Sequence, residues 1–314
     1  QRVAELPAAQ RSAAVPMIGA RCIATANRDD ATVTLQSLDR TTTPDRHLTP
    51  ALGHAHSTEE SATPLLAATS VTHPTRSLLA AAVPGALSLW EIGDASAPRA
   101  EPDAATPSPC GATRLRFGPR GRLLALATDD EVWIYSVAPR LDLLCRASPP
   151  ASAIVDVALR ESSTEGLLLV ASEGRVFTLF AVDNGGGAAV QLYCSELAGR
   201  SAPLCSCAIA PPAAQSDDAC RLVLGDVCGG VIVVALQANF AAHTTERELD
   251  LARLAGRDAG CSSELIPLQL DILPLGDDSG VCGLLVSTPG CTLLLRVGEY
   301  CALSIVAGAG DGVT

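Results

Sequence analysis

The stretch that decides the fold is Thr113-Arg114-Leu115-Arg116-Phe117-Gly118-Pro119-Arg120-Gly121-Arg122-Leu123-Leu124-Ala125-Leu126-Ala127-Thr128-Asp129-Asp130-Glu131-Val132-Trp133-Ile134-Tyr135-Ser136-Val137. Residues 113–117 alternate polar and apolar side chains, as a strand with one buried face does. A Gly/Pro turn follows at 118–121, then an apolar strand, an Asp-Asp turn and a third strand. Short strands joined by such turns form a β-meander, so this stretch predicts an antiparallel sheet.

The same meander recurs along the chain, and one position of its third strand can be traced through every copy. This position, which follows the inner apolar pair of the strand, holds Gln36, Trp90, Tyr135, Phe180, Val234 and Leu295 in turn. The spacing is 45 residues from Trp90 to Tyr135 and again from Tyr135 to Phe180. Longer spacings fall where loops rich in Pro, Thr, Ser, Ala and Asp intervene, since insertions there cost little.

Six sequence repeats are recognised, and we predict that they build one domain over residues 1–314. Their approximate bounds are 1–39, 62–92, 112–137, 141–182, 189–237 and 247–297, with 298–314 as a closing or outer strand. We expect outer, fourth strands at 141–145, 189–194 and 301–306. Residues 245–254 fit either a strand or a helix that begins with a capping box formed by Thr245 and Glu248.

The chain resembles the WD40-repeat β-propeller family. The resemblance is carried by Leu87-Ser88-Leu89-Trp90-Glu91 and by Phe117-Gly118-Pro119-Arg120-Gly121-Arg122-Leu123-Leu124-Ala125. It implies an all-β fold, a β-propeller of WD40-like four-stranded blades, with six recognisable units and a possible partial seventh. The family's Gly-His pair is missing from every repeat, and no repeat has the family's Asp after the Trp position. We therefore expect apolar packing between blades to replace most of the family's hydrogen-bonded network.

Composition and charge restrict the partners. Hydrophobic residues make up 48% of the 314 residues and charged residues 18%, so a packed core is expected. Aromatic residues are only 3%, so Leu, Val, Ile and Ala must build that core. The net charge is −12, and all 22 basic residues are Arg. Since phosphate binding depends on cationic contacts, no direct binding to nucleic acid is expected. Phosphoinositide-binding propellers carry an adjacent Arg-Arg pair, and this sequence has none.

The cysteines and the apolar runs indicate an intracellular protein, cytoplasmic or nuclear. Most of the 12 cysteines lie within apolar, strand-like runs, and no Cys-x-x-Cys occurs. Their even number leaves a secreted, disulfide-bonded protein as the alternative. The N-terminal stretch has no signal-peptide pattern, and no apolar run is long enough for a membrane span. Because the chain begins with Gln1, we expect a processed product or a piece of a longer protein.

The strongest local basic cluster is a candidate interaction surface. It consists of Arg114, Arg116, Arg120 and Arg122. Arg114 and Arg116 alternate with Leu115 and Phe117, so they share one face of a strand. Such a cluster can grip an acidic peptide or a phosphate, and it can equally be the solvated polar face of an ordinary strand.

Other motifs give no cofactor, metal or catalytic prediction. The most metal-like group, His54, His56, Glu59 and Glu60, lies in a long loop without a third strong ligand at a recognisable spacing. Cys205 and Cys207 are expected on one strand face, buried in the core. The glycine-rich segments 185–187 and 308–312 lack the Lys-Ser or Lys-Thr of a phosphate loop and are interpreted as turns or a frayed end.

Two functions remain open at this point. The first is a non-catalytic protein-interaction scaffold, a subunit or domain of a larger intracellular complex, with the long loops 39–61, 93–110 and 239–263 as candidate contact segments. The alternative is a propeller enzyme or metal-dependent hydrolase with a site at the central channel. Its candidate carboxylates are Asp129, Asp130, Asp156 and Asp226.

Overall fold

The structure is a computed structural model, and it is built almost entirely from strands. It describes residues 14–17, 22–26, 31–37, 46–51, 65–68, 77–92, 101–137, 140–150, 153–162, 165–183, 185–197, 202–210, 218–254, 265–274, 282–288, 292–297 and 305–309. The helical elements are the 3₁₀ turn η1 (Glu173–Arg175) and the one-turn helix α1 (Leu251–Leu254), and Leu265 is also in 3₁₀ conformation.

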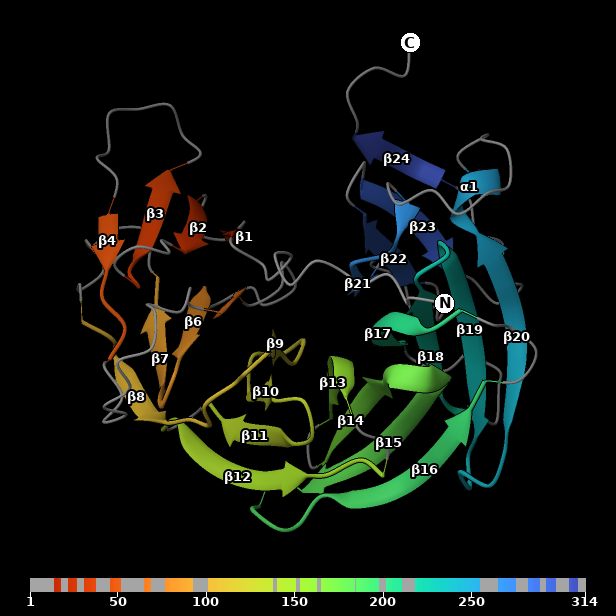
Figure 1. The fold of residues 1–314 in the computed structure, drawn as a ribbon, viewed down its shortest axis with the longest axis horizontal. Coiled ribbons are helices and arrows are strands. Elements are labelled where there is room, and N and C mark those ends of the chain that lie inside the picture. Colours follow the sequence, from red (N-terminus) through yellow and green to blue (C-terminus); the bar gives the residue numbers. More distant parts are fainter. Residues whose placement is uncertain are drawn as a thin grey trace, which may run out of the picture. The chain divides into compact units, whose positions relative to one another are not determined.

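The chain divides into two compact units with three sheets each (Figure 1). The first unit covers Gln1–Ala147 and Asn184–Gly187. Its sheets are β1 (Ala14–Met17), β2 (Cys22–Ala26), β3 (Val33–Ser37) and β4 (Arg46–Leu48); β5 (Leu65–Ala68), β6 (Leu78–Val83), β7 (Ala86–Glu91) and β8 (Ala104–Pro107); and β9 (Arg114–Phe117), β10 (Leu123–Ala127), β11 (Val132–Ser136) and β12 (Asp142–Ala147).

The second unit covers Ser148–Asp183 and Ala188–Thr314. Its sheets are β13 (Ile154–Glu161), β14 (Glu165–Ser172), β15 (Val176–Asp183) and β16 (Val190–Glu196); β17 (Leu204–Ala210), β18 (Asp218–Asp226), β19 (Gly230–Gln237) and β20 (His243–Asp250); and β21 (Gln269–Pro274), β22 (Cys282–Ser287), β23 (Thr292–Val297) and β24 (Ile305–Ala309). Each of the six sheets is a four-stranded antiparallel meander of consecutive strands.

The outer strands are where sequence and structure differ most. The predicted strands at 141–145 and 189–194 correspond to β12 and β16, whereas β24 begins at Ile305, and 301–304 lie outside the described residues. The three predicted loops 39–61, 93–110 and 239–263 contain β4, β8 and β20. Few residues of these outer strands are fully buried, so their sequences lack the apolar alternation that marks a strand with one buried face.

The sheets are also offset from the sequence repeats at their outer strands. The repeat drawn at 141–182 groups residues 142–147 with β13–β15, whereas the structure pairs β12 with β11. The prediction that residues 1–314 form a single domain stays a prediction.

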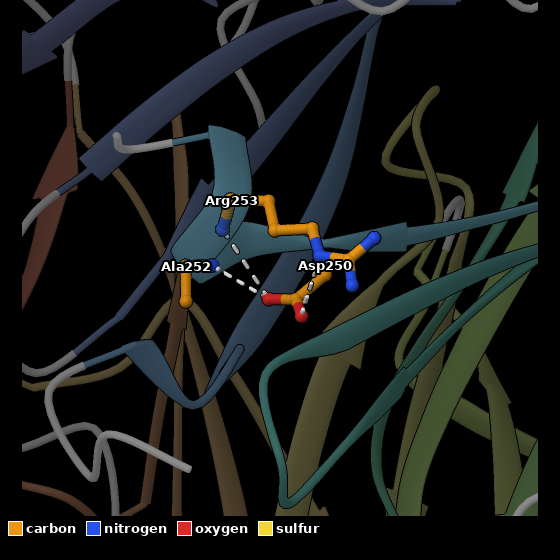
Figure 2. Close-up of polar contacts among 3 residues, drawn as sticks. All are labelled: Asp250, Ala252 and Arg253. Atoms are coloured by element: carbon orange, nitrogen blue, oxygen red, sulfur yellow. Dashed lines mark hydrogen bonds and ion pairs between the residues drawn. The ribbon is translucent and has the colours of Figure 1, made fainter. Parts of the chain in front are cut away.

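Residues 245–254 form the end of a strand and then a short helix, with no capping box. Thr245 and Glu248 lie within β20, which runs to Asp250. Asp250 instead caps α1, because its Oδ1 accepts hydrogen bonds from the backbone N–H of Ala252 at 2.9 Å and of Arg253 at 3.4 Å (Figure 2). The Arg253 guanidinium lies 4.0 Å from the other carboxylate oxygen. The cap lies where the chain leaves the outer strand β20, and the next two residues, Leu251 and Ala252, are buried in the core.

The structural repeat coincides with the position traced in the sequence. In every sheet the third strand pairs with the outer strand as far as the residue that precedes the traced position of the sequence repeat. These preceding residues are Leu35, Leu89, Ile134, Leu179, Val233 and Leu294. In the third to sixth sheets the pairing then resumes after a register shift. In the first two sheets it ends there among the described residues. The bulge thus occupies the same place in successive blades.

In the first unit, apolar layers bury both faces of the second sheet. Leu87 and Leu89 of β7 belong to a cluster shared with the third sheet, whereas Trp90, and after the strand Ile92, belong to one shared with the first sheet. Alternation along β7 therefore sends successive side chains to opposite neighbours. As the composition predicts, most of these layers is Leu, Val, Ile and Ala.

The second unit repeats this arrangement. Cys207 and Ile209 of β17 join a cluster shared with the fourth sheet, and Ala208 and Ala210 join one shared with the sixth. Polar contacts add to the apolar layer between the fourth and fifth sheets. The Tyr193 hydroxyl lies 2.6 Å from Nδ1 of His243, and both rings contact the buried ring of Phe177.

The family's hydrogen-bonded network is missing at the position where the sequence resembles the family most. Trp90 is 1% exposed, and its indole Nε1 has no hydrogen-bond partner among the described residues. At the equivalent position of the third sheet, the Tyr135 hydroxyl donates to the carbonyl oxygen of Pro107 in the second sheet, at 3.2 Å. This polar link adds to a largely aliphatic layer between the second and third sheets.

Candidate functional site

The structure separates the four candidate arginines into two pairs. Arg114 and Arg116 lie in β9, are half-buried, and pair with Ala127 and Ala125 of β10. Arg114 also donates from Nη1 to the carbonyl oxygen of Thr113, at 2.9 Å. Both side chains project from the inner edge strand of the sheet and are only partly accessible.

Arg120 and Arg122 are exposed, in the turn that joins β9 to β10. The N–H of Gly118 donates to the carbonyl oxygen of Leu123, and the N–H of Gly121 donates to that of Gly118, each at 2.9 Å. Gly121 has a φ of 63°, a conformation that glycine adopts without strain. The turn is therefore closed by its own backbone, and it presents both arginines to solvent.

A further arginine, which the sequence analysis missed, lies at the same end of this sheet. The N–H of Val137 donates to the carbonyl oxygen of Arg122 at 2.8 Å, so the β11–β12 connection begins beside the arginine turn. Arg140 lies in this connection and is exposed. The position of Arg140 could have been inferred from the sequence, because an antiparallel outer strand that starts near residue 141 must begin at this end of the sheet.

The opposite end of the third sheet is acidic. Thr128 closes the β10–β11 turn by accepting from the N–H of Glu131 at 3.1 Å and donating to Asp130 at 2.9 Å. Asp129 and Asp130 are exposed. Glu131 accepts from the indole N–H of Trp133 at 3.2 Å, and the Arg146 guanidinium lies 3.8 Å above the centre of that indole ring. The third sheet thus carries exposed Asp129 and Asp130 at one end, beside exposed Arg146. At the other end it carries three exposed arginines, and Asp142 is exposed there as well.

Two of the carboxylates considered for an enzyme serve the backbone instead. Asp156 is 2% exposed, and its Oδ2 accepts the N–H of Cys207 in the next sheet, at 2.9 Å. Asp226 is 1% exposed, and its Oδ1 accepts the N–H groups of Cys228 and Gly230 at 2.9 and 2.8 Å. These bonds hold an inter-sheet contact and a tight turn, which accounts for buried carboxylates without invoking catalysis.

The two thiols of β17 are buried, as predicted, but they do not share a face. A register shift between Leu204 and Ser206 turns Cys205 away from the side taken by Cys207. The Sγ atom of Cys205 lies 3.3 Å from the carbonyl oxygen of Pro267, whereas that of Cys207 lies 3.9 Å from the carbonyl oxygen of Leu169 in the fourth sheet. A paired-thiol site is therefore not formed.

The remaining motifs supply no ligand site among the described residues. The group His54, His56, Glu59 and Glu60 lies outside them. Across the part of the chain that the structure describes, no three His, Cys, Asp or Glu side chains are placed to hold a metal ion. Residues 185–187 are exposed between β15 and β16, as a turn is. Gly308, by contrast, lies in β24, which corrects its interpretation as part of a frayed end.

Solved structures with the same fold are WD40 propellers. The chain aligns with the RRP9 WD40 repeats with a TM-score of 0.59 at 13% identity, covering 95% of this chain and 79% of that one. For Saccharomyces cerevisiae Sqt1 the TM-score is 0.58 at 13% identity, with 92% and 72% covered. For the β-propeller domain of Myceliophteria thermophila Cps50 (Swd1) it is 0.54 at 12% identity, with 96% and 85% covered.

These likenesses define the class: the chain has the all-β propeller fold of WD40-repeat proteins, which confirms the fold predicted from its sequence. At 12–13% identity they show the fold alone. The sequence itself matches no family model and no curated protein. No helix among the described residues is long and apolar enough to cross a membrane.

Proposed function

We propose that this chain is a non-catalytic protein-interaction scaffold, a subunit or domain of a larger intracellular complex in the cytoplasm or nucleus. The observation that carries the proposal is the use of both faces of the second and fifth sheets for packing. When both faces of a sheet are buried, the loops and the outer strands are left to meet other molecules.

Three further features support the proposal. Likeness to WD40 propellers favours protein partners over a reaction, although fold alone does not fix function. The buried carboxylates Asp156 and Asp226 are engaged by backbone N–H groups. Five of the eight described thiols, among them Cys207, Cys220 and Cys282, are small buried apolar residues, which favours a reducing compartment.

Affinity purification with mass spectrometry tests the proposal. The chain is tagged and expressed in the cell that naturally makes it, and an unrelated acidic propeller with the same tag serves as control. We expect one or a few proteins to be recovered with the chain in constant ratio and not with the control. If no protein is enriched over the control at physiological salt, the scaffold role is wrong.

A further inference from the structure

The end of the third sheet that carries the β9–β10 turn gathers three exposed guanidinium groups in a strongly acidic chain. Arg120 and Arg122 come from this turn and Arg140 from the β11–β12 connection. Arg122 directly precedes β10, and Arg140 lies just before β12, two strands away. Neighbouring strands are about 4.8 Å apart, so the backbones that carry these side chains are roughly 10 Å apart.

We propose that this arginine surface, defined as Arg120, Arg122 and Arg140, binds a short acidic segment of a protein partner; this rests on the scaffold role proposed above. Arg120 and Arg122 each make an interaction within the chain. A guanidinium has five N–H donors in a planar fork, so an exposed one can keep such an interaction and still bind a carboxylate. The closed glycine turn fixes the backbone of two of the three, which lowers the ordering cost of binding.

The negative charge on the rest of the chain favours binding of a short acidic peptide over binding of a longer polyanion. The net charge of −12 repels a nucleic acid or an anionic membrane that extends beyond the arginine surface. Within the first unit, exposed carboxylates also lie at the corresponding end of the second sheet. The β7–β8 connection of the second sheet, which corresponds to the connection carrying Arg140, begins and ends beside exposed carboxylates: Glu91, Glu101 and Asp103.

The acidic neighbours therefore limit what the arginine surface can accept. Asp103 is held in place, since its Oδ2 accepts the backbone N–H of Glu91 at 2.8 Å. A longer acidic run meets this carboxylate group, and Asp142, exposed two residues after Arg140, already opposes part of a run confined to the third sheet. We infer that the acidic segment is only a few residues long and is flanked by neutral or basic residues.

The test measures binding of a labelled synthetic peptide with four Glu residues between Gly-Ser flanks, by fluorescence anisotropy. The variants are the triple substitution R120Q/R122Q/R140Q, which removes the three charges, and the single substitution R253Q, which removes an exposed Arg of α1. We expect the triple variant to bind about tenfold more weakly or worse, since each exposed ion pair adds modestly to the affinity and three are lost together. R253Q should bind like the wild type, and E101Q should bind more tightly.

Two results would overturn the arginine surface. One is equal peptide binding, or no binding, by the wild type and the triple variant when circular dichroism shows both to be folded. The other is tighter binding of inorganic phosphate or a single-stranded oligonucleotide than of the peptide, with competition between them, because the surface would then recognise phosphate.

Affinity purification from cells separates this failure from failure of the scaffold role. If the wild type and the triple variant recover the same partner, the scaffold role stands and the arginine surface is wrong. If the wild type recovers no partner, the scaffold role itself is wrong, whatever the peptide does.

Discussion

At the scale of the residue, Tyr135 shows how one polar atom is fitted into an aliphatic layer. Its ring is fully buried, and its hydroxyl donates to Pro107 of the neighbouring sheet. Burial raises the pKa of Tyr135 to about 12, and the positive charge of Arg146 partly opposes this shift. Because the folded pKa lies above the unfolded one of about 10, the neutral phenol is favoured by folding, and stability is lost as the pH rises from about 10 through 12. Titration followed by tyrosinate absorbance should show one tyrosine that ionises near pH 12 as long as the chain stays folded. Y135F should abolish this late ionisation and should lower the free energy of unfolding by about 1 kcal/mol. Y193F, in another sheet, is the matched control; if it removes the late ionisation instead, the assignment is wrong.

At the scale of the element, Gly225 of β18 allows three segments to meet. A Cβ atom built there would clash with Oγ of Ser206 in β17 and would lie 2.7 Å from Cγ of Pro267. The proline ring cannot move aside as a flexible side chain would, so G225A should destabilise the fold by about 1–3 kcal/mol. Ser206 is fully buried, and its hydroxyl has no hydrogen-bond partner among the described residues. S206A alone should therefore be neutral or stabilising, and it should reduce the cost of G225A because it removes one of the two clashing groups. Denaturant unfolding of the two single variants and the double variant measures the coupling, and strictly additive effects would contradict the close approach.

Elements also show where sequence reasoning succeeds and where it fails. The inner strands of the third sheet were predicted because Leu115 and Phe117 alternate with arginines and an apolar strand follows. The outer strand β8 was missed because Ala104–Pro107 is short and none of its residues is fully buried, so burial leaves no clear pattern in its sequence. At the site, residue type identified Arg120 and Arg122. Arg140 required knowledge of which strand returns to which end, and the separation of Cys205 from Cys207 required a bulge, which depends on tertiary packing.

At the scale of the whole molecule, the open question is whether six sheets unfold as one domain. Apolar layers couple neighbouring sheets, and in repeat architectures such nearest-neighbour interfaces carry cooperativity along the chain. Leu79 lies in the layer between the first and second sheets, Leu224 lies in the layer between the fourth and fifth, and both are fully buried. L79A and L224A should each cost about 2–5 kcal/mol, because each removes a buried side chain and leaves a cavity. If residues 1–314 are a single domain, scanning calorimetry should show one transition, and either substitution should lower its midpoint. Two transitions, with L79A shifting one and L224A the other, would divide the chain into two independently folding domains and contradict the single-domain prediction.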